Sequence, residues 1–146
     1  MLDIIIDDKQ YRPFISYAVS SCDFFSLVFE NEDKASGYVL QEVYLSIAGF
    51  VFDKKGIRYH PDTGTDFRNS DIAYFECNKH TGGILQAANS IYDWNGGSFP
   101  EELCFYRNGK IWMACTYHER CIIINNETQE DLEFFKKAGI TILCQL

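Results

Sequence analysis

An Asn-Gly dipeptide between two apolar runs constrains the fold of this 146-residue chain more than any other local feature. Asn108-Gly109 separates residues 103–107 from residues 110–115. Both central residues of a type I′ turn need a positive φ, so Asn-Gly in this setting predicts a two-residue β-hairpin. Both faces of the runs are apolar, which predicts a hairpin covered by other parts of the protein. The predicted register pairs Arg107 with Lys110, Phe105 with Trp112 and Cys104 with Met113.

Further short apolar runs predict the other strands of a mainly antiparallel sheet. They cover residues 2–6, 24–29, 72–77, 121–124 and 140–146, with another extended piece at 14–19. Residues 58–70 are rich in turn formers and predict a long polar loop. Loops of that length inside a compact domain are often functional.

Three segments show helical signals. Apolar residues recur at helical spacing over 36–52, and Thr81 can cap a helix over 81–94 that the glycines at 96 and 97 end. The third, at 128–138, starts as a capping box and ends at Gly139. The sum is a single α+β domain over residues 1–146, with six to eight strands and three helices.

Composition limits the partners and the location. The chain has 13 Lys+Arg and 21 Asp+Glu, a net charge of −8, and its 47% hydrophobic content excludes disorder of the bulk. The negative charge argues against nucleic acid or an anionic membrane and favours a basic partner. We recognise neither a signal peptide nor an apolar run of about 18 residues, so we expect a cytoplasmic protein.

We interpret the six cysteines as buried reduced thiols. Disulfides are typical of exported proteins, and we recognise no export signal in this sequence. Two Cys-x-x-His repeats supply zinc-ligand types, and Cys121 follows the second. Residues three apart on a strand point to opposite faces, which opposes a shared site. No metal or cofactor is therefore predicted. A metal-binding or enzymatic domain remains an alternative, with ligands Cys77, His80, Cys115 and His118.

Catalytic motifs are weak. Asp62-Thr63-Gly64 spells the short aspartic-protease signature, but it lies in the predicted polar loop without flanking apolar strands. The sequence contains no GxGxxG, phosphate loop or HExxH. We therefore expect a protein that is not an enzyme. The acids of the predicted loop remain the best candidates for binding, against the alternative of a plain solvated surface.

Two stretches carry a family resemblance. The first is Gly37-Tyr38-Val39-Leu40 at a helix start, and the second runs from Phe99-Pro100 to Trp112 and ends near His118-Glu119. They resemble the small cytoplasmic immunity proteins of bacterial polymorphic-toxin and contact-dependent inhibition systems. The resemblance implies a protein that binds a cognate toxin and blocks its active site.

Many such toxins are nucleases with basic clefts, in which acidic side chains can stand in for phosphates. We therefore expect two groups of acids to contact the toxin. The first group is Asp62, Asp66 and Asp71, and the second is Glu30, Glu32 and Asp33. A third interpretation is an assembly domain that pairs through residues 140–146, if they form an edge strand.

Overall fold

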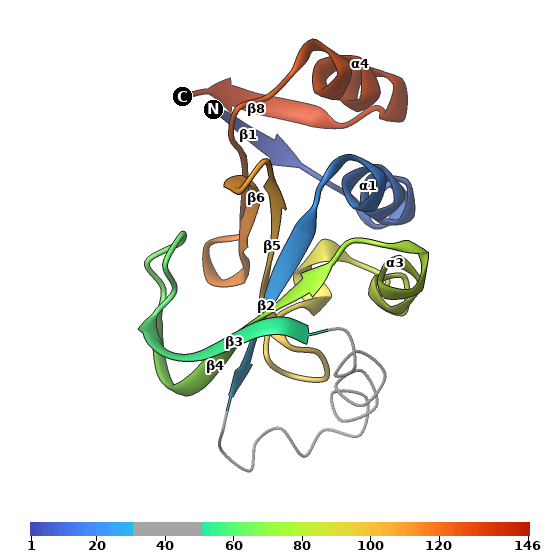
Figure 1. Cartoon of the computed structure of the whole chain (residues 1–146). Helices are drawn as coiled ribbons and strands as arrows, with labels where there is room; N and C mark the ends of the chain where they lie inside the picture. The colour runs from blue at the N-terminus through green and yellow to red at the C-terminus, as the bar shows by residue number, and fades with distance from the viewer. Residues whose placement is uncertain (31–50) are drawn as a thin grey trace.

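The computed structural model describes residues 1–30 and 51–146, which form one antiparallel sheet of eight strands with three α-helices (Figure 1). The strands are β1 Leu2–Ile5, β2 Phe24–Glu30, β3 Val51–Tyr59, β4 Asp66–Glu76, β5 Glu101–Arg107, β6 Lys110–Thr116, β7 Cys121–Ile124 and β8 Thr141–Gln145. The helices are α1 Asp8–Ser21, α3 Lys79–Leu85 and α4 Gln129–Ala138, with 3-10 turns η3 Ile91–Asp93 and η4 Tyr117–Glu119. The strand order is β3-β4-β2-β5-β6-β7-β1-β8. The predicted α+β class and antiparallel sheet are thus confirmed.

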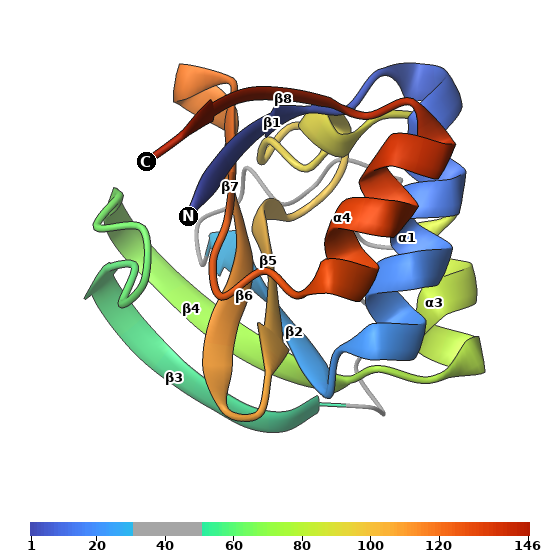
Figure 2. The same ribbon diagram turned by 90° about the horizontal axis from the view of Figure 1, so that it is seen from above.

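All three helices lie on one face of the sheet (Figure 2). The main core fills the space between them and the strands, and its largest fully buried side chains are Tyr11, Phe14, Phe25, Phe75, Trp94, Phe105, Trp112 and Phe135. We call the opposite side of the sheet the outer face. A smaller cluster is buried there, formed by Val28 of β2 and by Phe67 and Ile72 of β4.

The N-terminal region corrects one prediction. Residues 14–19, expected to be extended, belong to helix α1. Asp7 caps this helix through a reciprocal capping box with Gln10, at 2.9 Å in both directions. Its buried residues, Tyr11, Phe14, Ile15 and Ala18, follow helical spacing. Pro13 inside the helix is what made this segment look interrupted.

The prediction of a long loop over residues 58–70 is also wrong. Strands β3 and β4 extend into it, and only residues 60–65 form the turn between them. Five consecutive residues of β3, from Phe52 to Gly56, are exposed. An edge strand with so little burial needs no apolar alternation, so its sequence looks like a loop.

The predicted helix at 81–94 is shorter than expected. Helix α3 ends at Leu85, and the 3-10 turn η3 follows at Ile91. Of the helix predicted at 36–52, positions up to 50 lie outside the described residues, and Val51 and Phe52 belong to strand β3.

Helix α4 is confirmed, including the capping box of Thr128 with Asp131 and the left-handed Gly139. The hairpin of β5 and β6 is confirmed too, with positive φ at Asn108 and Gly109. The predicted register is confirmed only next to the turn, where Arg107 pairs with Lys110. A bulge after Phe105 pairs Phe105 with Met113 and Cys104 with Ala114, one residue from the prediction. All six cysteines are free, but the prediction that they are buried holds only for Cys22, Cys104 and Cys115; Cys77 and Cys121 are half-buried, and Cys144 is exposed on the edge strand β8.

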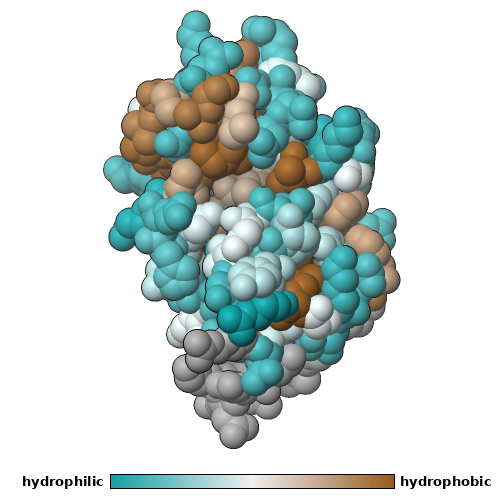
Figure 3. Space-filling view, turned by 90° about the vertical axis from the view of Figure 1, so that its left-hand side faces the viewer, coloured by the Kyte–Doolittle hydropathy of each residue, from teal (hydrophilic) through white to brown (hydrophobic). Residues whose placement is uncertain are grey.

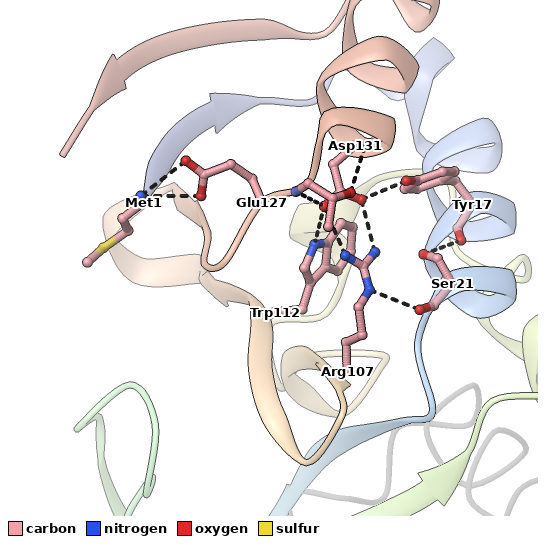
Figure 4. Close-up of polar contacts among 8 residues, drawn as sticks. Met1, Tyr17, Ser21, Arg107, Trp112, Glu127 and Asp131 are labelled. Atoms are coloured by element: carbon pink, nitrogen blue, oxygen red, sulfur yellow. Dashed lines mark hydrogen bonds and ion pairs between the residues drawn. The ribbon is translucent and has the colours of Figure 1, made fainter.

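A buried carboxylate joins helix α4 to the rest of the fold (Figure 4). Asp131 is fully buried and accepts two hydrogen bonds from Arg107, both 2.9 Å. Tyr17 donates a third at 2.6 Å and Trp112 a fourth at 3.2 Å. Burial raises the pKa of Asp131, but these bonds outweigh it and hold the pKa well below its ordinary value. Asp131 thus closes the capping box of α4 and also holds that helix to α1 and the central hairpin.

Candidate functional site

The turn of the β3–β4 hairpin is held against strand β5 by a buried carboxylate. We call residues 60–66 the arm tip. Thr63 Oγ1 donates to Glu102 Oε2 at 2.6 Å, and Thr65 Oγ1 donates to Glu102 Oε1 at 2.7 Å. Glu102 is 1% exposed and takes a left-handed backbone conformation with φ of 53°. The two charge-assisted bonds therefore fix the arm tip to the sheet.

His60 stabilises the arm tip from inside. It is 1% exposed, and its Nδ1 accepts the backbone N–H groups of Asp62 at 3.1 Å and Thr63 at 3.2 Å. Burial lowers the pKa of His60 to about 4, although the charge of Asp62 raises it. At neutral pH the ring is therefore neutral, with its proton on Nε2, which lies 3.8 Å from Cys104 Sγ.

Asp62 is anchored to the outer face of the sheet. Tyr106 donates to Asp62 Oδ2 at 2.6 Å, and the Ser26 hydroxyl lies 3.2 Å from the same phenol oxygen. The Asp62-Thr63-Gly64 tripeptide forms a turn here, with Gly64 at φ 73° and its N–H donating to the His60 carbonyl. Asp62 as a residue remains exposed at the surface, although its Oδ2 is bound by Tyr106.

The other two acids of the first predicted group have different surroundings. Asp66, at the arm tip, forms an exposed ion pair with Arg58 at 2.9 Å. Asp71 lies 3.6 Å from Lys54 Nζ, and it pairs across the strands with Phe29, which belongs to the core on the helix side. Paired residues of antiparallel strands share a face. The structure therefore brings Asp62 and Asp66 together at the arm tip and places Asp71 on the other side of the sheet.

Glu30, from the second predicted group, contacts a second buried carboxylate. Its side chain interacts with that of Glu101, which is 6% exposed. Burial raises the pKa of Glu101 to about 8, and Glu30 raises it further. A Cβ at Gly96 would lie 2.4 Å from Glu101 Oε1, so this packing requires glycine. Glu32 and Asp33 lie outside the described residues.

Glu101 and Glu102 are the functional candidates that sequence reasoning missed as buried groups. In the sequence both stand directly before the apolar run of the central hairpin. The available signal was their direct continuity with an apolar strand after Pro100, which makes them part of β5.

The alternative metal ligands are not assembled. Cys77 follows β4, His80 is exposed on α3, Cys115 is buried on β6 and His118 is exposed in η4. Across residues 1–30 and 51–146, no three His, Cys, Asp or Glu side chains gather in a metal-binding arrangement. Burial raises the pKa of the Cys115 thiol to about 12, which disfavours the thiolate that zinc needs.

Comparisons of the chain with protein-family models, curated proteins and solved structures find no match. None of the helices in the described segments is long and apolar enough to cross a membrane. The function is therefore inferred from the arm tip, the charge of the chain and the edges of the sheet.

Replacing Thr63 by valine is expected to lower the free energy of unfolding by about 1–2 kcal/mol, because Glu102 loses a buried O–H donor. Urea denaturation measures the change. Thr116→Val, at a half-buried threonine whose hydroxyl makes no cap hydrogen bond, is the matched control and should leave stability within about 0.5 kcal/mol. Equal stability of the two variants would show that the hydroxyl of Thr63 does not hold the arm tip.

Proposed function

We propose that this chain is a non-enzymatic binding protein of the cytoplasm that neutralises a cognate bacterial toxin, as immunity proteins do. The observation that carries the proposal is the arm tip, where exposed Asp62 and Asp66 stand on a turn fixed by Glu102 and Tyr106. A rigid binding element loses little conformational entropy when it binds. The net charge of −8 adds attraction toward a basic partner.

The arm tip acts by occlusion in this proposal. A nuclease cleft that binds phosphates is lined by cations, and the carboxylates of Asp62 and Asp66 take the place of two phosphates. Asp66 is available for this exchange because its pair with Arg58 is more than half exposed and hence weak. Asp71 and Glu30 are secondary candidates, since one faces the helix side and the other interacts with Glu101.

The test is the binding of this chain to the product of the adjacent gene, where that product is a large secreted protein with a C-terminal toxin domain. Asp62→Lys/Asp66→Lys should slow association by about tenfold or more at low salt, because it reverses the charge that steers the encounter. The control, Glu130→Lys/Glu133→Lys, makes the same change in net charge on α4, which lies on the helix side of the sheet.

Stopped-flow or biolayer kinetics give the association rates, and survival of toxin-expressing cells gives the neutralisation. Circular dichroism must show that both double variants are folded. An equal rate for the wild type and the arm-tip variant would refute the assignment of this surface. Equal slowing by both variants would show that only net charge matters, and no binding at all would refute the immunity function.

A further inference from the structure

Strand β8 forms one edge of the sheet, and its side chains are exposed along the whole strand. It pairs with β1 on one side, and no described strand lies on its other side. All five of its residues are exposed, with Ile142 at 42% and Leu143 at 55%. An unpaired edge of this kind presents a row of N–H and C=O groups to which another strand can add.

The surface around this edge is apolar. Met1 at 50%, Ile5 at 43% and Leu146 at 66% exposure add to the two side chains of β8. In the space-filling view, brown surface gathers on the upper part of the molecule, where Figure 1 places the first and last strands (Figure 3). Contiguous apolar surface of this kind marks interaction sites in soluble proteins.

The two edges of the sheet differ in charge. Strand β3, at the opposite edge, carries Asp53, Lys54, Lys55 and Arg58, and such charges protect an edge from pairing. Strand β8 carries no Asp, Glu, Lys or Arg. Charged side chains therefore oppose edge-to-edge pairing at β3 but not at β8.

We infer that the free edge of β8 binds β8 of a second copy of this chain, so that two sheets join antiparallel across a two-fold axis. The net charge of −8 opposes contact between copies, and β8 is the edge strand that adds no charged side chain to this repulsion. A two-fold axis also brings the same apolar side chains against each other. Leu143 is the middle residue of β8, so a symmetric antiparallel pairing of the two strands places it next to that axis.

Sedimentation velocity of the purified chain over a wide micromolar range tests the dimer. The mass should rise with concentration from 16.9 kDa toward twice that value. Leu143→Lys places two ammonium groups near the axis and should raise the dimer dissociation constant by at least about tenfold. Tyr59→Lys, at a 59% exposed position of the other edge, is the matched control and should leave it unchanged.

Cysteine crosslinking gives an independent readout, because Cys144 on β8 is the exposed thiol. A short bis-maleimide should produce a covalent dimer that Cys144→Ser abolishes and Leu143→Lys suppresses. A monomer mass at every concentration would overturn the inference. So would a dimer that Leu143→Lys and Tyr59→Lys weaken equally, or crosslinking that Leu143→Lys leaves unchanged.

Discussion

Replacing Asp131 by alanine is expected to lower the free energy of unfolding by about 3–5 kcal/mol, the typical effect of breaking a buried ion pair. The carboxylate is fully buried and bonded to Arg107, Tyr17 and Trp112, so its removal leaves several donors unpaired. The Arg107 side chain is only 17% exposed and would remain without a counter-charge. The loss should loosen the contacts that link α4 to α1 and the central hairpin.

Thermal and urea unfolding measure this effect. Glu133→Ala, two residues along the same helix at an exposed position, should change stability by no more than about 0.5 kcal/mol. The pKa of Asp131 is lowered in the folded state, so its contribution is complete above its ordinary pKa of 3.8 and is lost as pH falls below it. An Asp131→Ala protein as stable as Glu133→Ala would contradict the structural role of the pair.

The second large effect is a loss of stability as the pH rises through neutrality to about 8. The pKa of Glu101 is raised to about 8 in the folded state, so folding favours its protonated form. The unfolded chain releases this proton near its ordinary pKa of 4.5, and stability falls as pH rises between the two values. Between pH 6.5 and pH 8 the expected decrease is about 1–2 kcal/mol, because the slope of 1.36 kcal/mol per pH unit falls to half as the pH reaches the folded-state pKa.

His60 works in the opposite direction at lower pH. Its pKa is lowered from 6.5 to about 4, so stability rises with pH between these values and offsets the fall from Glu101. Glu101→Gln, which keeps a neutral side chain at every pH, should remove the decline above pH 6.5. Urea titrations at half-unit pH steps on both proteins measure it, and an unchanged decline in the variant would assign it to another group.

The elements predicted well from sequence are those whose signals are local. The Asn108-Gly109 turn and the capping box of Thr128 each specify their backbone within a few residues, and both are confirmed. Helix α1 was missed because Pro13 outweighed the spacing of its apolar residues. Strand β3 was missed because an edge strand that buries little carries no alternating pattern.

The site was predictable only in part. Asp62 and Asp66 stand out in the sequence as acids among turn formers, and the structure places both at the arm tip. Their support was not predictable, because Thr63 and Thr65 bond to Glu102 across 39 and 37 residues. The side of the sheet that Asp71 faces depends on the pairing of β4 with β2, which local spacing does not encode.

The position of the first strand has a consequence for synthesis on the ribosome. Strand β1 lies between β7 and β8, so both of its neighbours are made more than 100 residues after it. Until residue 121 has emerged, the apolar side chains of Leu2 and Ile4 have no adjacent strand to pair with. This apolar segment is therefore open to aggregation in the nascent chain until its neighbouring strands have been synthesised. The sheet is completed only at the end of synthesis, through contacts of high sequence separation.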